Sequence, residues 1–476
     1  MEEHKNNTES INEAKALADK LFYRKKSAFE VMSDRELSAA MEYAKGYAEY
    51  LFNSKTEREA VKTSVEMLKK QGFKEYRLGD SIERGGKYYL NNRDKSLFAF
   101  RIGTEDINNG MRICAAHIDS PRLDLKQNPL YEDSGFAYLK THYYGGLRKY
   151  QWPTLPLALH GTVTLSGGKN VDICIGEDSG DPVLMISDLL PHLSGEQGKK
   201  PLDHAYDGET MNAVACTSPY RENGAAADTS DAVKLNLMKL LNEKYGIKEA
   251  DFMTAELCLV PAGRPVDIGL DRWLMGGYGH DDKVCAYPAL TALCDSTDSS
   301  HTLMCVLADK EETGSDGVTG MQCSLLSELI DELSEALGGS GRVCRSRSSC
   351  LSTDVSAAYD PGFSDCFEKR NTAFAGSGVV INKYNGARGK SSTSDASSEY
   401  LGKLRDIFDS DGVLWQTAEP GRVDCGGSGT VARFIANHNI DTVDIGVPVI
   451  SMHAPFEAIS KVDLYCAYRA FLAFYR

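Results

Sequence analysis

The stretch "MRICAAHIDSP", residues 111–121, is an almost continuous apolar run that ends in polar side chains. Such a run is typical of a buried strand that delivers its last residues to the carboxyl edge of a parallel sheet. The stretch "HTLMCVLADKEET", residues 301–313, repeats the pattern with a charged end. Ligands of open α/β sheets bind beyond the carboxyl ends of the strands. The two stretches therefore predict an α/β sheet that carries functional residues at its strand ends.

Predicted strands and helices alternate around these two runs. Strand-like segments are "SSCLSTDV" (348–355), "GSGVVINK" (376–383) and "VDIGVPVIS" (443–451). Apolar residues at helical spacing mark residues 281–296, 320–339, 394–408 and 461–476. Near the N-terminus, Ser33 and Glu36 form a capping box that predicts a helix over 33–52, and a further helix is expected before Gly72. The alternation predicts the α/β class, as an α/β/α sandwich with a mixed sheet.

The middle of the chain has a different character. Between about Leu123 and Pro265, short strand candidates are separated by Gly, Pro and Asp turns, and a polar stretch near 194–231 interrupts them. The candidates are "LALHGTVTL" (157–165), "VDICIGE" (171–177) and "PVLMISDLL" (182–190). We therefore expect an α/β domain formed by residues 1–123 and 266–476, with residues 124–265 as a β-rich insertion.

The composition limits the classes of partner. The chain has 476 residues, with 53 Lys and Arg against 68 Asp and Glu, and its net charge of −15 argues against nucleic-acid or membrane-surface binding. Thirteen cysteines occur singly and never as C-x-x-C, so we interpret them as reduced core residues rather than zinc ligands. No leader-like or membrane-spanning apolar run is present in the sequence, so a soluble cytoplasmic protein is expected.

Five places at predicted element ends carry histidine or carboxylate side chains. His117 and Asp119 are two residues apart and share one face of a strand, where a carboxylate can orient a metal-binding imidazole. Glu311 and Glu312 directly follow an apolar strand, and their neighbouring side chains diverge, so one can bind a metal while the other faces a substrate water. The other three places hold Asp281 with Asp282, Asp354, and His453.

Each place also has an ordinary structural explanation when it is taken alone. Asp281 and Asp282 are favourable at a helix N-terminus, and His280 beside them is typical of a loop residue. The Glu pair is harder to explain, because adjacent carboxylates repel each other unless a cation compensates. Together, two imidazoles and three carboxylates form a mixed nitrogen and oxygen set that suits Zn²⁺, Mn²⁺ or Co²⁺. The set is large enough for two divalent ions if one carboxylate bridges them.

The order and wording of these motifs resemble the aspartyl aminopeptidase and vacuolar aminopeptidase I family of dinuclear zinc metalloaminopeptidases. The resemblance rests on "AAHIDSPRLDLK", "YGHDDKVCAY", "DKEETGSDG", "STDVSAAYDP" and "ISMHAPFE", together with "YYGGLRKYQW" and "DCGGSGT". It covers nearly the whole chain. One departure is "HDDKV", where relatives often have an Asp-Asn pair, so the role of Asp282 stays open.

The resemblance implies a role for each matching residue. His117, Asp281 and Asp354 would hold one ion, and Asp281, Glu312 and His453 the other, most often zinc. Glu311 would be the general base, Asp119 would orient His117, and Lys383 would line the substrate side. The resemblance also implies that the insertion mediates dimerisation and that the dimers assemble into a tetrahedral dodecamer.

These roles imply a metalloaminopeptidase, a hydrolase that removes the N-terminal residue from peptides with a free N-terminus. The two ions would activate a water, and Glu311 would accept its proton and pass it to the leaving amine. The alternative is a related dinuclear carboxypeptidase or amidohydrolase, which would need an arginine clamp for a substrate carboxylate. Arg342, Arg345 and Arg347 precede a site strand and keep that alternative open. A metal-free binding protein of the same fold would not need Glu311. The sequence does not choose the preferred N-terminal residue.

Overall fold

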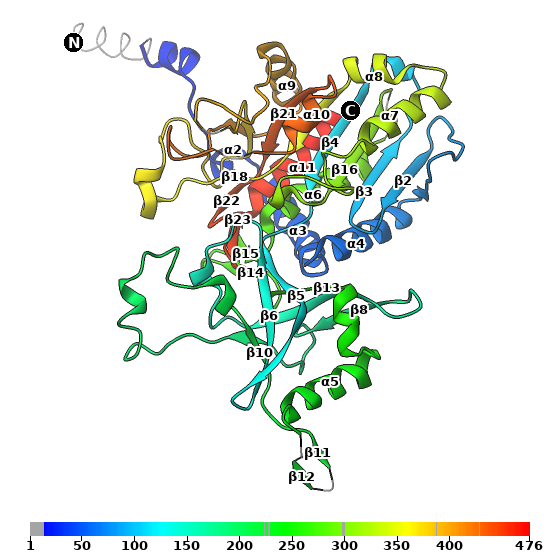
Figure 1. Ribbon diagram of the computed structural model, residues 1–476. Helices are drawn as coiled ribbons and strands as arrows, with labels where there is room; N and C mark the ends of the chain where they lie inside the picture. Colours follow the sequence, from blue (N-terminus) through cyan, green and yellow to red (C-terminus); the bar gives the residue numbers. More distant parts are fainter. Residues whose placement is uncertain (1–13, 223, 227–228, 298–299, 387, 428) are drawn as a thin grey trace, which may run out of the picture.

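A nine-stranded mixed sheet forms the centre of the upper part of the molecule (Figure 1). The structure is a computed structural model, and it describes residues 14–222, 224–226, 229–297, 300–386, 388–427 and 429–476. The strand order is β1 (Lys74–Glu75), β2 (Lys87–Asn92), β3 (Ser96–Arg101), β16 (Thr302–Ala308), β4 (Met111–His117), β17 (Ser349–Thr353), β21 (Asp441–Gly446), β19 (Val379–Asn382) and β20 (Trp415–Thr417). The central strands β16, β4, β17 and β21 are parallel, and β3 and β19 flank them antiparallel. The predicted mixed sheet is confirmed.

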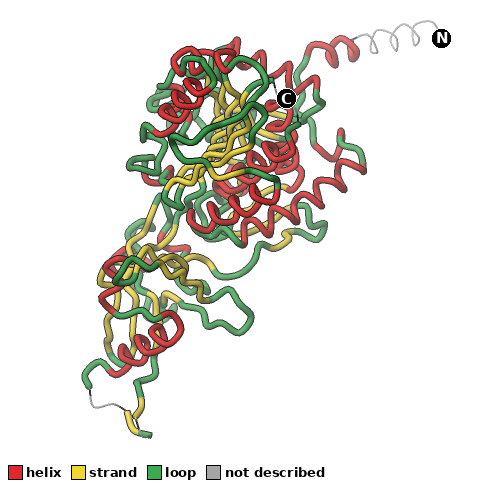
Figure 2. Tube along the Cα trace, turned by 90° about the vertical axis from the view of Figure 1, so that its right-hand side faces the viewer, coloured by secondary structure: helices red, strands yellow, loops and turns green. Residues whose placement is uncertain are grey.

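Helices cover both faces of this sheet because its central strands are apolar on both sides. Along β4, Cys114 and Ala116 pack into one core, and Ile113 and Ala115 into the other. The first core also contains residues of α3 (Asp34–Phe52), α4 (Glu57–Lys70), α6 (His280–Asp295), α9 (Ser398–Ser410) and α11 (Lys461–Tyr475). The second contains residues of α7 (Leu325–Ala336), α8 (Gly341–Arg347) and α10 (Ala432–Ala436). Figure 2 shows the strands between these helices, so the α/β/α sandwich is confirmed.

Capping residues set the starts of the first helices. Ser33 accepts the backbone N–H of Glu36, whose carboxylate accepts the N–H of Ser33, which is the capping box expected from the sequence. Ser27 and Glu30 make the same arrangement at the short helix α2 (Ala28–Val31).

An antiparallel sheet of seven strands forms the lower part of the molecule (Figure 1). Its order is β8 (Asn170–Ile175), β7 (Leu157–Thr164), β13 (Ala255–Pro261), β5 (Arg122–Asp133), β6 (Phe136–Tyr144), β10 (Ala213–Cys216) and β9 (Met185–Ile186). Helix α5 (Ala232–Tyr245) contributes to the core of this sheet, and β11 (Arg221–Glu222) pairs with β12 (Ala225–Ala226) near it. The segment 182–190 was expected to be a full strand, but only Met185 and Ile186 form one, and Leu184 adds an isolated bridge to Leu157. Strand β10 instead comes from the polar stretch. The boundaries 124 and 265 stay a prediction.

A small five-stranded sheet joins the two parts. Its order is β14 (Val266–Ile268), β15 (Leu274–Gly277), β23 (Glu457–Ser460), β22 (Pro448–Ile450) and β18 (Ser356–Ala357). The segment 443–451 was predicted as one strand, and this is wrong, because the chain leaves the large sheet after Gly446 and enters the small one at Pro448. A Cβ at Gly446 would lie 1.9 Å from the carbonyl oxygen of Asp354, so only glycine allows the two crossing segments to approach so closely.

The cysteines occupy both buried and exposed positions. All thirteen cysteines are free thiols, but Cys174, Cys366 and Cys425 are exposed, so the expectation that all of them lie in the core is wrong for these three.

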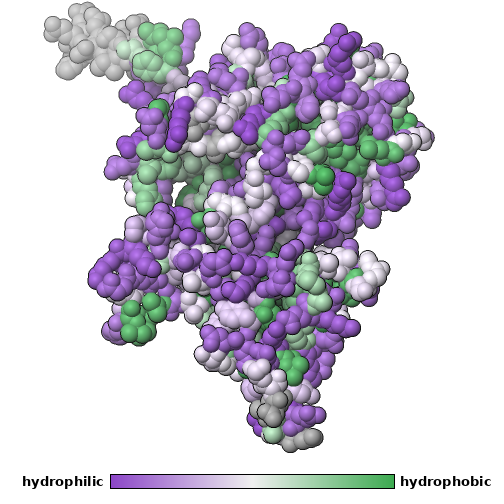
Figure 3. Space-filling model, viewed as in Figure 1, coloured by the Kyte–Doolittle hydropathy of each residue, from purple (hydrophilic) through white to green (hydrophobic). Residues whose placement is uncertain are grey.

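On the face seen in Figure 3, hydrophilic residues cover most of the surface. Within the described ranges, no helix has the length and apolar character that crossing a bilayer requires.

Ion pairs connect the first turn of α4 to the seven-stranded sheet. Arg122 Nη1 lies 2.7 Å from Glu57 Oε2. Glu59 Oε1 lies 2.7 Å from Nδ1 of the buried His160, whose Nε2 lies 3.1 Å from Glu177 Oε1. Burial lowers the pKa of His160, but the two carboxylates outweigh it and raise this pKa to about 9. A positively charged His160 therefore ties α4 to β7.

We predict that His160 makes stability depend on pH. Its pKa is about 9 in the folded protein and about 6.5 in an unfolded chain, a difference worth on the order of 3 kcal/mol. Because the folded pKa is the higher one, the stabilisation is complete below about pH 6.5 and is lost as the pH rises through 9. Thermal unfolding at pH 6 and pH 10 should show the advantage of the wild type over His160→Gln shrinking at the higher pH. The control is His204→Gln, at an exposed position. An equal advantage at both pH values would contradict the prediction.

Candidate active site

The five predicted metal ligands lie together where strands of the large and small sheets end. His117 ends β4, Glu312 follows β16, and Asp354 lies between β17 and β18. Asp281 comes shortly after β15, and His453 lies in the turn between β22 and β23. Their side chains form two groups, His117 with Asp281 and Asp354, and Asp281 with Glu312 and His453. Within each group the ligand atoms lie within 4.8 Å of one another.

Asp281 belongs to both groups, and each of its oxygens faces one histidine. Nε2 of His117 is 3.1 Å from Asp281 Oδ1 and 3.8 Å from Asp354 Oδ1. Nε2 of His453 is 3.1 Å from Asp281 Oδ2 and 3.7 Å from Glu312 Oε2. This is the arrangement that a carboxylate bridging two ions requires.

The charges of the site influence one another strongly because most of its side chains are buried, although the His453 side chain is 35% exposed. Burial raises the pKa of Asp281, but its contacts with His117 and His453 outweigh this and hold the pKa below its usual range. For His453, burial lowers the pKa, while the Asp281 carboxylate raises it to about 10. Burial raises the pKa of Glu312 and of Asp354 well above their usual ranges, and neighbouring carboxylates add to this. The protein's own cations therefore compensate only part of the negative charge.

The remaining compensation fits a divalent metal. Within the described part of the chain, no lysine or arginine forms an ion pair with Asp281, Glu312 or Asp354. Oε1 of Glu312 is buried and has no hydrogen-bond partner among the described residues. Imidazole nitrogens and carboxylate oxygens at this spacing are zinc ligands by type. The residues present therefore fit the metal expected from the sequence.

Asp119 connects the parts of the site. Its side chain is fully buried and accepts the backbone N–H groups of Glu311 and Glu312, each at 3.2 Å. Its Oδ1 is 3.4 Å from Nδ1 of His117, which also lies 3.1 Å from the Asp119 carbonyl oxygen. The hydroxyl of Tyr144 donates to Asp119 Oδ2 at 2.7 Å. Asp119 thus contacts both the His117 ring and the turn that carries the Glu pair.

The motif "YYGG" brings residues of the seven-stranded sheet to the site. Besides the Tyr144 contact, a Cβ at Gly145 would lie 3.2 Å from Cβ of Glu312, and the backbone there has φ of +73°. The carbonyl oxygen of Gly146 lies 2.7 Å from Nδ1 of His453. In the sequence, this motif contributed only to the family resemblance. Tyr144, Gly145 and Gly146 were not predicted as site residues, because the residues that they contact lie far from them in the chain.

Glu311 lies at the wall of a cavity of about 280 Å³. The lining residues include Glu312, His453, Thr430, Arg433 and Phe434. Burial raises the pKa of Glu311 to about 7, and the Asp119 and Asp281 carboxylates act in the same direction. Glu311 belongs to neither ligand group, so its carboxyl is available to a molecule in this cavity.

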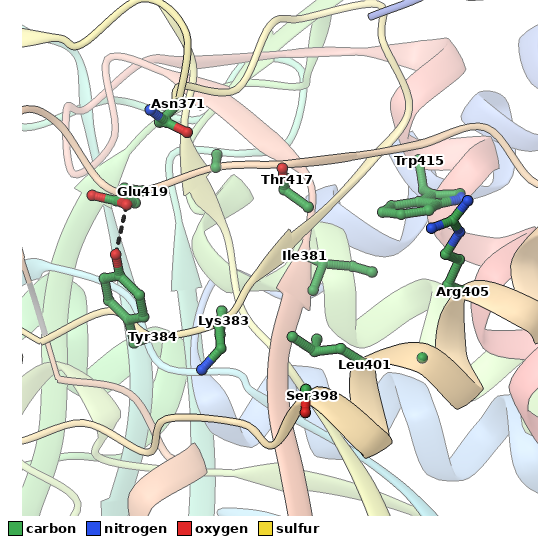
Figure 4. A pocket seen from close by; sticks show the side chains of 12 residues that line it. Asn371, Ile381, Lys383, Tyr384, Ser398, Leu401, Arg405, Trp415, Thr417 and Glu419 are labelled. Carbon is green, nitrogen blue, oxygen red and sulfur yellow. Dashed lines mark hydrogen bonds between the residues drawn. The ribbon is translucent and has the colours of Figure 1, made fainter. Parts of the chain in front are cut away.

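Lys383 lies in a different cavity from the predicted ligands. Figure 4 shows Lys383 with Tyr384, Glu419, Trp415 and Arg405 around a cavity of about 510 Å³, whose lining contains none of the five ligands. The Lys383 amine pairs with Asp395. Its expected substrate-binding role stays a prediction.

His280 and Asp282, next to Asp281, belong to neither ligand group. Nδ1 of His280 lies 2.7 Å from the Tyr47 hydroxyl, and burial lowers the pKa of this histidine to about 3, so the ring is neutral. Burial raises the pKa of Asp282 well above its usual range.

The arginines that kept the alternative open lie away from the ligands. Helix α8, which contains them, precedes β17, whereas Asp354 follows the other end of that strand. Arg345 Nη1 donates to Asp331 Oδ1 at 2.5 Å, and Arg347 Nη1 to the carbonyl oxygen of Asn108 at 3.1 Å. Arg433 is the arginine that lines the cavity beside Glu311.

Comparison with known proteins agrees with this site. Residues 50–475 match the family model described as aminopeptidase I zinc metalloprotease (M18). A probable M18 family aminopeptidase 1 of Clostridium acetobutylicum is 43% identical over 457 residues, which are 94% of this chain and 97% of that protein. The crystal structure of the M18 aminopeptidase of Thermotoga maritima has a TM-score of 0.91 at 38% identity and covers 96% of this chain and 100% of that one. The Saccharomyces cerevisiae mApe1 dodecamer, at 18% identity and a TM-score of 0.73 over 93% of this chain and 97% of that one, shares the fold. The chain therefore belongs to the M18 family of zinc aminopeptidases and is a metalloaminopeptidase.

Proposed function

We propose that the protein is a dinuclear aminopeptidase in which Asp281 bridges two divalent ions, most often Zn²⁺, with Mn²⁺ or Co²⁺ as substitutes. The observation that carries the proposal is the position of Asp281, with one oxygen 3.1 Å from His117 and the other 3.1 Å from His453. His117, Asp281 and Asp354 would hold one ion. Asp281, Glu312 and His453 would hold the other.

Glu311 has the position of the general base. Bound divalent ions polarise a carbonyl oxygen and lower the pKa of a water at the site. The Glu311 carboxylate accepts the proton of the water that attacks the scissile carbonyl, and then delivers it to the leaving amine. Asp119 supports this step because it holds the backbone N–H of Glu311 while it orients His117.

The substrates are peptides with a free N-terminal amine, and the protein acts as a homo-oligomer. Residues 124–265 are the dimerisation domain in this proposal, and the dimers form a tetrahedral dodecamer; a dodecamer is the assembly named for mApe1. Exposed apolar side chains on this part of the chain support a surface covered by another subunit: Val183, Met185, Leu189, Leu190, Leu193 and Leu202. Thirteen free thiols support a reducing, cytoplasmic location.

A substrate panel tests the activity. Chelation should abolish the hydrolysis of aminoacyl p-nitroanilides, and Zn²⁺, Mn²⁺ or Co²⁺ should restore it. Peptides with a free amine should be cleaved, and the same peptides with an acetylated N-terminus should not. A carboxypeptidase or amidohydrolase would accept the acetylated peptides, so their cleavage would favour the alternative. Varying the first residue of the panel then identifies the preferred side chain.

Glu311→Gln should separate metal binding from turnover. The amide cannot accept a proton, so we expect kcat to fall about 10²- to 10⁴-fold while the metal content stays that of the wild type. Steady-state kinetics and elemental analysis measure the two quantities. The control is Glu196→Gln, at an exposed position that is far in sequence from the residues that line the cavity. A wild-type kcat in Glu311→Gln would exclude this residue as the base.

Metal stoichiometry tests the bridge. Asp281→Ala should lose both ions because it removes a ligand from each group, whereas Asp354→Ala should lose only the ion beside His117. The control is Asp282→Asn, a buried neighbour outside both groups, which should keep two ions. Elemental analysis of the three purified variants gives the counts. Two ions retained by Asp281→Ala would show that this carboxylate is not the bridge.

A further inference from the structure

Glu457 is a buried carboxylate that none of the roles above uses. It is the first residue of β23, and its side chain is 1% exposed. Strand β23 pairs with β15 in the register Gly277↔Glu457, so Glu457 lies beside the segment that leads from β15 to Asp281. It also lies four residues after His453 in the chain. Glu457 is therefore placed between two segments that carry proposed ligands.

The two oxygens of Glu457 hold the main chain of both segments. Oε2 accepts the backbone N–H of Asp281 at 3.1 Å, and Oε1 accepts the backbone N–H of His453 at 2.7 Å. Hydrogen bonds to a carboxylate are stronger than those between neutral groups. One side chain thus ties together the two residues whose side chains face each other across the second ligand group.

The segment that carries His453 needs such support. His453 has φ of +64° and Ser451 has φ of +58°, a left-handed backbone that non-glycine residues rarely adopt and that persists only when the surroundings hold it. The carbonyl of Asp281 is held separately. It accepts a hydrogen bond from the Ser120 hydroxyl at 2.6 Å, and Lys283 donates to the same hydroxyl at 2.6 Å. Glu457 provides the matching contact on the N–H side.

We propose that Glu457 is a positioning residue that sets the distance between Asp281 and His453 and so preorganises the second metal group. The expected effect of Glu457 on metal binding rests on the proposed function. The hydrogen bonds of Glu457 to Asp281 and His453 do not depend on it. Residues that orient metal ligands change metal affinity by about 10- to 100-fold when they are replaced. The ion held by His117, Asp281 and Asp354 should be affected less, because only one of its three ligands, Asp281, contacts Glu457 among the described hydrogen bonds, whereas two of the three ligands of the second group do.

Two substitutions grade the loss of acceptors. Glu457→Met keeps the length of the side chain and removes both acceptors, and Glu457→Gln keeps one acceptor oxygen. The chain offers a matched control in Asp463, a fully buried carboxylate that accepts the N–H groups of Gly376 and Gly378 at 2.6 and 2.7 Å but touches no proposed ligand in the described contacts. Asp463→Leu and Asp463→Asn repeat the same two chemical changes at that position.

The first measurement is metal release from the purified holoenzyme to a chromogenic chelator. We expect Glu457→Met to release one of two ions at a 10- to 100-fold lower chelator concentration, with Glu457→Gln between it and the wild type. The Asp463 variants should release both ions as the wild type does, whatever their loss in melting temperature. Wild-type release by Glu457→Met, or an equal shift in the Asp463 variants, would overturn the proposal.

The second measurement is hydrogen exchange of the same proteins, followed by mass spectrometry. Peptides that contain residues 279–282 and 451–457 should exchange faster in the Glu457 variants, whereas the Asp463 variants should show faster exchange around 376–378 instead. Unchanged exchange in both Glu457 segments would overturn the positioning role. This measurement separates the two proposals. A wild type that binds fewer than two ions would contradict the dinuclear function. Hydrogen exchange in the two segments would still decide whether Glu457 is a positioning residue.

Discussion

The Asp281 carboxylate, buried between two imidazoles, is the interaction on which the rest of the site depends. Water stabilises a carboxylate far better than a protein interior does, so a buried carboxylate needs compensating charge. Two more carboxylates, Glu312 and Asp354, lie within the same groups of side chains. His117 and His453 offset part of this charge. In the proposed function, divalent cations supply the remainder, which would allow the chain to gather these acids in one place.

The junction of two sheets provides the geometry for that gathering. Within the large sheet alone, side chains at the ends of neighbouring strands lie in a row. Here the chain leaves the large sheet after β17 and β21 and enters the small sheet at β18 and β22. Asp354 lies at one of these crossings, and His453 follows the other. The ligands are therefore arranged around a point rather than along an edge, which is the geometry that metal coordination requires.

The sequence predicted the elements whose pattern is local. The apolar runs that became β4 and β16 are buried on both faces, and Ser33 with Glu36 marks a helix start at the expected place. The five proposed ligands were predicted because each lies at an end of an expected strand or helix, and the structure brings them together. The break at Gly446 was not predicted, because its cause is the close approach of Asp354, ninety-two residues earlier in the chain. Tyr144 and Glu457 were missed although both lie in motifs that carry the family resemblance, because their contacts with Asp119 and Asp281 arise only when the chain folds.

The pairing of β5 with β13 has a consequence for how this molecule can be taken apart. The chain enters the seven-stranded sheet on β5 and leaves it on β13, and Leu123 lies opposite Leu259. The two ends of that module are thus adjacent, so a short linker could replace it in a gene without opening the large sheet. Such a shortened chain would lack the Tyr144 hydroxyl on Asp119 and the Gly146 carbonyl on His453. The module can be removed as one piece of polypeptide, but residues from both pieces contact the site. A substitution in either piece must therefore remain compatible with the other.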